Sequence, residues 1–366
     1  MGKWSLNIKQ RIIQAFPGVW FGCAVTHHIL ELHYAFERYG YNSIVISELI
    51  DKNLPEKDIF LNPDNIDFNS GDILIYHYSG AHPLGFQLGK LPCRKIIVYH
   101  NVTPPVFFVD YSEPYKNSCI KSRQEIFELS FLFQEAWADS GYNASCLRKM
   151  GFDNIKILPI PYKKSKSSAI PNASIIEKYA HTNNILFVGR IVPNKKQEDI
   201  VRAFYYYRKN VPNSRLFLIG GCYPGLEKYK DMLVSLIDSL GLNDFVIMPG
   251  KASSEDLEAY WKSASLFLCM SEHEGFCVPI LEALAHEIPV LAYSSSAIPE
   301  TLGKAGLLFN KKNFSSVAEA MNAIIENNEL VSFFKKTGMK HISKYSPGII
   351  GEMAVNYISN VRDETN

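Results

Sequence analysis

The sequence predicts an α/β fold of two domains, each built on a parallel β-sheet. The length of 366 residues is ample for two domains of ordinary size. Short apolar runs alternate with helical patterns along the chain, as in β-α-β units. This rhythm breaks over residues 162–182, which are polar and rich in Ser, Lys and Pro, and then restarts. We therefore expect an N-terminal domain over 1–164, a linker over 162–182 and a C-terminal domain over 183–345, with a cleft between the domains.

In the first domain, six apolar runs have the length and composition of strands. Helical patterns between them are clearest at 24–38 and 119–135. A further helical pattern at 346–361 ends the chain, and we assign the segment 346–366 to the first domain. The strand-like runs are 11–16, 43–47, 72–78, 95–100, 136–140 and 155–160.

The second domain repeats the pattern with runs that are apolar almost without interruption. Such runs are typical of strands that are buried on both faces of a sheet. Ligands of open parallel sheets bind beyond the carboxyl ends of the strands, so functional residues are expected in the loops that follow these runs. The strand-like runs are 184–190, 214–220, 244–250, 265–270, 289–293 and 306–309, and the helical stretches are 196–209, 225–240, 254–263, 276–286, 297–302 and 314–326.

Composition excludes several classes of protein. The net charge of +1, from 38 basic and 37 acidic residues, lacks the basic excess of a nucleic-acid-binding domain. Seven scattered cysteines without a C-x-x-C pair argue against a cysteine zinc or redox motif. Together with the absence of a signal peptide, they predict a cytoplasmic protein. No apolar run is long enough to span a membrane. Lys163, Lys164 and Lys166 could touch anionic lipid, but a solvated linker is the simpler reading.

The stretch "FVGRIVPNKKQEDIVRAF" (187–204) predicts a strand, a glycine turn and a helix. Arg190 ends the strand, and Lys195 lies near the start of the helix. Two cations at a strand end could hold a diphosphate, since the arginine fork forms paired charge-assisted hydrogen bonds. A solvated loop with ordinary surface cations is the alternative.

The next strand is followed by "IGGCYPG" (219–225). Its adjacent glycines could let the backbone approach a ligand, or could serve only a tight turn. The stretch is not G-x-G-x-x-G, so the dinucleotide-binding fingerprint is absent.

The stretch "SEHEGFCVPILEALAHEIPV" (271–290) places Glu274 in a loop and Glu282 on the following helix. If both were helical, eight residues would separate them by about 12 Å, too far for a glycosidase carboxylate pair. The helix N-terminus, with the N–H groups of residues 275–278, is suited to phosphate. Carboxylates on either side of this helix N-terminus could accept hydrogen bonds from hydroxyl groups. A ligand with hydroxyl groups on both sides of its phosphate is a nucleotide sugar. An amphipathic core helix with solvated glutamates is the alternative.

Two first-domain loops carry candidate residues. His100 ends the run "KIIVYH" and precedes a proline-rich loop, and Gly22 lies in the turn before the first helical pattern. A histidine at a strand end can act on a ligand, although a lone histidine is as often structural. The sequence has no D-x-D triplet, so metal-bridged diphosphate binding is not indicated, and Arg190 with Lys195 would neutralise the phosphates.

Taken in order, these motifs resemble glycosyltransferase family 4, retaining enzymes of the GT-B fold with two Rossmann-like domains. The motifs are "VGR" followed by Lys195, "LIGG", "MPG", "SEHEGFCVPILEAL" and "PVLAYSSSAIPETLGKAGLLF". In the first domain, "IYHYSGAHPL" and "YHNVTPPVFF" look like bacterial members that build surface polysaccharides, including O-antigen and lipopolysaccharide. The first loop, "PGVWFGCAV", departs from the family because Trp20 and Phe21 replace small or acidic residues.

The resemblance implies a role for each site residue. Arg190 and Lys195 would bind the donor diphosphate, Glu282 the ribose hydroxyls, and Glu274 the transferred sugar. His100 would face that sugar from the first domain. The remaining donor-binding residues would be Gly22 near the phosphates, Gly250 and Lys251 near the base, and Gly275, Phe276, Cys277 and Val278 at the helix N-terminus.

The expected activity is transfer of a hexose from a UDP- or GDP-sugar to a growing glycan, lipid-linked at the cytoplasmic face of the membrane. No metal or other cofactor and no nucleic-acid partner is expected. The enzyme would be cytoplasmic, with peripheral membrane contact as an option. Alternatives are a dinucleotide-dependent oxidoreductase, which the missing fingerprint disfavours, and a non-catalytic two-domain sugar-binding protein.

Overall fold

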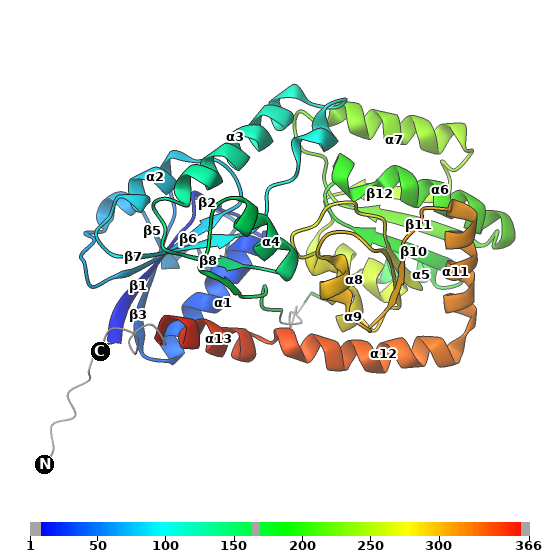
Figure 1. Ribbon diagram of the computed structural model, residues 1–366. Helices are drawn as coiled ribbons and strands as arrows, with labels where there is room; N and C mark the ends of the chain where they lie inside the picture. Colours follow the sequence, from blue (N-terminus) through cyan, green and yellow to red (C-terminus); the bar gives the residue numbers. More distant parts are fainter. Residues whose placement is uncertain (1–8, 163–168, 360–366) are drawn as a thin grey trace, which may run out of the picture. The chain divides into compact units, whose positions relative to one another are not determined.

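The computed structural model describes residues 9–162 and 169–359. By mutual packing, the described residues divide into two compact units. Unit 1 contains residues 9–102, 118–162 and 344–359, and unit 2 contains residues 103–117 and 169–343. The labels of helices and strands follow Figure 1.

Unit 1 is built on a parallel sheet in the order β5-β3-β1-β6-β7-β8-β9. Two of its strands, β6 and β8, consist entirely of buried residues. A short pair, β2 with β4, lies outside this sheet. The strands are β1 (Lys9–Ala15), β2 (Gly18–Val19), β3 (Tyr41–Ile46), β4 (Leu49–Ile50), β5 (Phe60–Leu61), β6 (Ile73–Tyr78), β7 (Arg94–Tyr99), β8 (Glu135–Ala138) and β9 (Ile155–Ile157).

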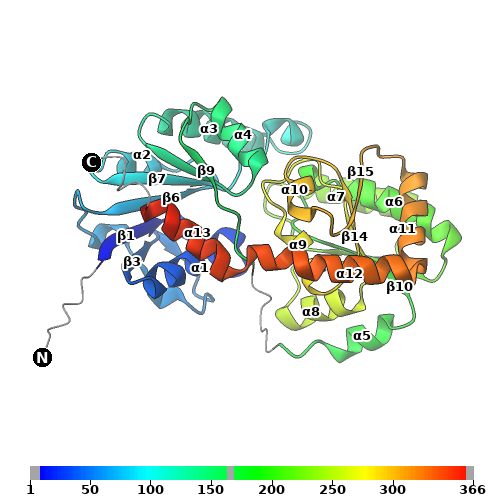
Figure 2. The ribbon, with the colours of Figure 1, turned by 60° about the horizontal axis from the view of Figure 1, so that its bottom comes forward.

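The C-terminal helix α13 lies beside α1 in unit 1, as Figure 2 shows. Close contact is possible because Gly351 lacks a side chain where α13 meets Ala35 of α1. Ile350, Ala354 and Ile358 complete a buried cluster with strand and α1 residues such as Ile12. The helices are α1 (Ala24–Arg38), η1 (Lys57–Ile59), η2 (Pro63–Asn65), α2 (Pro83–Gly89), α3 (Glu113–Leu129, of which 113–117 belong to unit 2), α4 (Gly141–Lys149), η5 (Ser343–Tyr345, of which Ser343 belongs to unit 2) and α13 (Pro347–Ser359).

Unit 2 contains a second parallel sheet, in the order β12-β11-β10-β13-β14-β15. All four residues of β13 are buried, as its unbroken apolar sequence predicts. Each of the six runs predicted for this domain forms one strand. The strands are β10 (Asn183–Val188), β11 (Ser214–Ile219), β12 (Val246–Gly250), β13 (Leu266–Cys269), β14 (Val290–Tyr293) and β15 (Leu307–Phe309).

The six helices predicted for unit 2 are present with shifts of their ends, and α12 was not predicted. Helix α12 packs against α9, where Gly338 lies against Leu284. The helices are η3 (Pro105–Phe108), α5 (Ala173–Tyr179), η4 (Pro193–Lys195), α6 (Gln197–Asn210), α7 (Glu227–Ser239), α8 (Ser254–Ser263), α9 (Val278–Ala285), α10 (Ile298–Leu302), α11 (Phe314–Glu326) and α12 (Asn328–Ile342).

Residues 103–117 differ from the predicted domain division, which placed all of 1–164 in one domain. They pack with unit 2 because their aromatic side chains find partners there. The ring of Tyr111 meets that of Tyr229 edge to face, with centroids 5.1 Å apart. The ring of Phe107 lies 6.1 Å from that of His273. The helix predicted at 119–135 is α3, and it begins earlier, at Glu113.

The linker predicted at 162–182 is in part a helix. Helix α5 begins after Asn172, whose side chain accepts a hydrogen bond from the Ser174 N–H and donates one to Asp256 at 2.7 Å. The buried ring of Tyr179 packs on Phe217 with centroids 4.8 Å apart. Lys163, Lys164 and Lys166 lie outside the described residues. Among the helices of the described ranges, none has the length and apolar character needed to cross a bilayer.

Candidate functional site

Three strand-end loops of unit 2 are joined by backbone hydrogen bonds. The Gly189 N–H donates to Ile219, and the Gly220 N–H donates to the Gly250 carbonyl, each at 2.9 Å. A Cβ atom on Gly220 would collide with the carbonyl group of Gly189, and the φ of Gly220 is +149°. The first glycine of the pair in "IGG" is therefore required by the packing of two loops. Gly221 has open space where a side chain would be, with only Lys251 Cβ nearby at 3.9 Å.

Lys195 and Glu274, predicted from separate motifs, form an ion pair. Lys195 ends η4, Glu274 lies between β13 and α9, and Lys195 Nζ is 2.6 Å from Glu274 Oε1. Both side chains are largely buried, with 13% and 9% of their surfaces exposed. Burial alone would lower the pKa of Lys195, but the charge and hydrogen bond of Glu274 outweigh it and raise this pKa. The pair therefore places a fixed cation beside a carboxylate at the end of the sheet.

Asn194 joins the two loops that carry this ion pair. Its side-chain amide donates to the His273 carbonyl at 2.9 Å, and its own carbonyl accepts from the Glu272 N–H at 2.9 Å. On the other side, the Glu274 N–H donates to Ser296 Oγ at 2.8 Å. Sequence reasoning missed Asn194 and Ser296, although "SSSA" after β14 is a polar signal at another strand end.

Helix α9 begins close to Glu274, with Pro279 in its first turn. Cys277 immediately precedes the helix in a left-handed conformation, with φ +74°, and no side chain caps this end. Cys277 and Cys269 are buried, and one ligand-type atom of each lies within 4.8 Å of one carboxylate oxygen of Glu274. Gly275, Phe276, Cys277 and Val278 therefore surround the start of a helix, as predicted.

Glu282 lies on the second turn of α9 and is half-buried. Within the described part of the chain, its carboxylate has no hydrogen-bonding or ion-pair partner. Burial raises the pKa of Glu282 to about 7. A carboxylate that is partly desolvated and unpartnered is a candidate acceptor for ligand hydroxyl groups.

Arg190 is exposed at the end of β10. Its guanidinium lies over the ring of Tyr223, 5.5 Å from the centroid. Its backbone carbonyl accepts a hydrogen bond from Gln197 at 2.8 Å. In residues 9–162 and 169–359, no carboxylate forms an ion pair with this guanidinium. Arg190 is thus an available cation with a fixed backbone.

The predicted residues of unit 1 are Gly22 and His100. Gly22 has φ +77° in an exposed turn, with open space around its Cα. Next to it, the Trp20 ring lies over Gly18, where a Cβ would collide with it, and the Phe21 N–H donates to Asp51 at 3.1 Å. The Trp20 ring thus has a local packing role, whereas Phe21 is held by its backbone and its side chain is exposed.

The side chain of His100 is only 2% exposed, and both its ring nitrogens have partners inside unit 1. Nδ1 lies 3.0 Å from Asp139 Oδ2, and Nε2 lies 2.9 Å from His77 Nδ1. Direct contact between this ring and a ligand would require one of these partners to be exchanged. The assignments of His100 and Gly22 to a donor remain predictions.

The architecture of the whole chain is that of the GT-B class, two α/β units each with a parallel sheet. Its fold matches the crystal structure of the Anabaena protein HepE in complex with UDP and glucose, with a TM-score of 0.75. The alignment covers 96% of this chain and 100% of that one at 16% identity, a likeness of fold.

The sequence of unit 2 matches a family model. Residues 172–341 match the model of the family described as glycosyl transferases group 1. The resemblance seen in the motifs is thereby confirmed.

Two curated relatives share part of the sequence. One is the GDP-mannose-dependent alpha-(1-6)-phosphatidylinositol monomannoside mannosyltransferase of Mycobacterium tuberculosis, 29% identical over 150 residues, which are 38% of each chain. The other is O-antigen chain mannosyltransferase B of Escherichia coli, 23% identical over 185 residues, or 50% of this chain and 47% of that one. The matches therefore span half or less of the length of these relatives.

Proposed function

We propose that this protein is a retaining glycosyltransferase that moves a hexose from a UDP- or GDP-sugar to a growing glycan. The observation that carries the proposal is the Lys195–Glu274 ion pair beside the start of α9. It brings together a cation for phosphate, a carboxylate for sugar hydroxyls and a helix N-terminus. These groups match the parts of a nucleotide sugar.

The donor would be held by groups at the strand ends of unit 2. Arg190 and Lys195 would bind the diphosphate together with the backbone of residues 275–278. Glu282 would accept hydrogen bonds from the ribose, for which its unpartnered carboxylate is suited. Glu274 would hold the transferred sugar, and the base would lie near Gly250 and Lys251.

Transfer would break the bond between the sugar C1 and the diphosphate oxygen and form a bond from C1 to an acceptor oxygen. Retention without a carboxylate nucleophile fits attack on the face from which the diphosphate departs, with the leaving phosphate taking the acceptor proton. Arg190 and Lys195 would stabilise the negative charge that develops on this phosphate. Because these cations can supply the charge, we propose that the reaction itself needs no metal ion.

The relatives support the choice of donors and acceptor. The mycobacterial relative is named for GDP-mannose and a phosphatidylinositol mannoside, and the fold neighbour is in complex with UDP and glucose. The E. coli relative is named for an O-antigen chain. We therefore propose a lipid-linked glycan acceptor, met by a cytoplasmic enzyme with peripheral membrane contact, in the synthesis of a cell-surface polysaccharide.

A nucleotide screen followed by a turnover assay tests the proposal. UDP or GDP should raise the melting temperature of the full chain more than ADP does. The preferred UDP- or GDP-sugar should then be slowly hydrolysed without acceptor, and hydrolysis should persist in EDTA. Stabilisation by NAD with no response to UDP or GDP would instead identify an oxidoreductase. Donor binding with no hydrolysis and no transfer to glycan lipids would identify a sugar-binding protein.

A further inference from the structure

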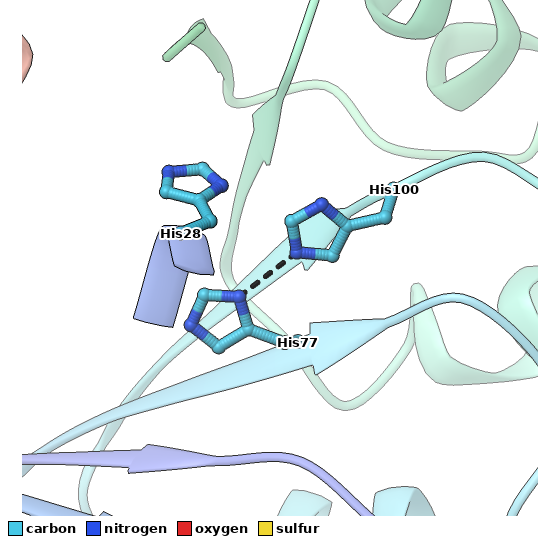
Figure 3. A group of neighbouring side chains, drawn as sticks. All are labelled: His28, His77 and His100. Carbon is cyan, nitrogen blue, oxygen red and sulfur yellow. Dashed lines mark hydrogen bonds between the residues drawn. The ribbon is translucent and has the colours of Figure 1, made fainter. Parts of the chain in front are cut away.

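Three histidines meet inside unit 1. His28 lies on α1, His77 on β6, and His100 directly after β7 (Figure 3). One ring nitrogen of each lies within 4.8 Å of those of the other two. The rings of His28 and His77 are fully buried, and that of His100 nearly so. This three-histidine cluster joins segments that are distant in the sequence.

The outer hydrogen bonds of the cluster fix which nitrogens carry hydrogen. The amide nitrogen of Gln14 donates to the Ile29 carbonyl at 3.1 Å, so Gln14 Oε1 is the acceptor for His77 Nε2, also at 3.1 Å. His77 therefore carries its hydrogen on Nε2, and its Nδ1 has a free lone pair. This leaves His77 able to bind a cation on the side that faces His100.

His100 is oriented in a corresponding way by Asp139. His100 Nδ1 lies 3.0 Å from Asp139 Oδ2, and an ionised Asp139 can only accept a hydrogen bond. The hydrogen of His100 is then on Nδ1, and the lone pair of Nε2 points at His77 Nδ1, only 2.9 Å away. Two lone pairs at this distance repel each other unless a positive charge lies between them.

His28 supplies an independent observation. Both of its ring nitrogens are buried without a hydrogen-bonding partner, and Nδ1 lies 3.8 Å from Asp139 Oδ1. Such an arrangement is rare, because an unpaired buried polar group is costly. A neutral imidazole with an unused lone pair is the form in which histidine binds metals.

We propose that His28, His77 and His100 bind one divalent transition-metal ion, Zn²⁺ being the best fit. A single cation would resolve the facing lone pairs of His77 and His100 and give His28 a partner. Zn²⁺ prefers imidazole nitrogens, and two ligands of a tetrahedral ion at about 2.0–2.1 Å lie about 3.3 Å apart, so the His77–His100 pair would need to open by only a few tenths of an ångström.

The surroundings already resemble the outer shell of a metal site. Ligating histidines usually donate their second N–H to a carboxylate or carbonyl oxygen, as His100 does to Asp139 and His77 to Gln14. A proton shared by His77 and His100 would relieve the same repulsion, but it would leave the ring nitrogens of His28 without a hydrogen-bonding partner. A buried ion here would join α1, β6 and β7 and would stabilise unit 1.

Metal content and cobalt spectroscopy test the site without relying on activity. The full chain, purified without a polyhistidine tag, is stripped with a chelator and titrated with Zn²⁺ or Co²⁺. We expect about one ion per chain, the visible absorption of four-coordinate Co²⁺, and a Zn²⁺-dependent rise in melting temperature. His28→Gln and His77→Gln should abolish all three. His33→Gln is the matched control, because His33 lies on the same helix but pairs with Ser43 at 2.9 Å.

Asp139→Asn provides a second variant in case the histidine variants do not fold. It keeps all three ligands and should weaken metal affinity about 10- to 100-fold, as loss of an outer-shell carboxylate does. Substoichiometric metal and no cobalt absorption in folded wild-type chain would overturn the proposal. So would a metal content that is equal in wild type and in a folded His77→Gln variant. A strongly deshielded proton between His77 and His100 in chain that takes up no metal would assign the cluster to proton sharing.

Discussion

The two units treat their polar strand-end residues in different ways. In unit 2, Arg190 is exposed without a carboxylate partner among the described residues, and Glu282 is half-buried and unpartnered. In unit 1, His100 is turned inward and both its nitrogens are occupied. A position at a strand end therefore predicts which groups can meet, but the neighbouring side chains decide which atoms remain free for a ligand.

The substitution with the largest expected effect removes the carboxylate of Glu274, the partner of Lys195 in unit 2. Glu274→Ala should lower the rate of sugar transfer at least about 100-fold, because a group held against the reacting sugar is removed. Nucleotide should still bind, as measured by calorimetry. Glu274→Gln separates charge from shape, since it keeps the size of the side chain. Unimpaired turnover in either variant would remove Glu274 from the chemistry.

Removal of the exposed cation should have the next largest effect. Arg190→Ala should weaken binding of the nucleoside diphosphate by about 2–3 kcal/mol, since charge-assisted hydrogen bonds are lost. Calorimetry with UDP and GDP measures this change. Arg202→Ala is the matched control, as Arg202 is an exposed arginine on α6. Equal affinities for wild type and Arg190→Ala would refute the assignment.

Substitutions in the glycine pair after β11 test whether packing or ligand approach determines the conformation of this loop. Gly220→Ala should destabilise unit 2 by about 1–3 kcal/mol, because the new Cβ would collide with Gly189 and the backbone has a positive φ. Gly221→Ala should cost less than about 1 kcal/mol, since space is open there. Urea unfolding measures both, and equal losses would contradict the packing explanation.

The smallest effect concerns the pH dependence of stability. Burial raises the pKa of Glu282 to about 7, above its ordinary value of 4.5, so the folded chain keeps a proton that the unfolded chain releases. The free energy of unfolding should therefore fall as the pH rises between these values, by about 1–2 kcal/mol after allowance for solvent screening.

Glu282→Gln should flatten this slope, because glutamine does not titrate. Urea unfolding at about pH 5 and about pH 7.5 measures the pH dependence of stability for the wild type and for Glu282→Gln. Glu319→Gln, an exposed change on α11, should leave the slope intact. A slope that is the same in wild type and Glu282→Gln would show that the carboxylate is solvated.

Much of unit 2 could be predicted from the sequence because its strands are buried on both faces and its loops contain clear glycine and proline signals. Strand-end positions predicted that Lys195 and Glu274 lie at the same edge of the sheet, but the ion pair between them appears only in the structure. By contrast, the packing of residues 103–117 with unit 2 depends on aromatic contacts between distant segments, such as Tyr111 with Tyr229. The His77–Asp139 environment of His100 is also non-local, so no spacing in the sequence could reveal it.

The hydrogen bonds of Asn194 bear on which residues of this site can be substituted in evolution. Asn194 holds the Glu274 loop through the carbonyl of His273 and the N–H of Glu272, groups that every residue type except proline supplies. These two bonds therefore survive a change of side chain at 272 or 273, although Glu272 also pairs with Lys312 and the buried His273 ring packs on Phe107. Asn194 has no such freedom, because its side-chain amide has no equivalent in the backbone. Constraint is thus expected one residue before Lys195.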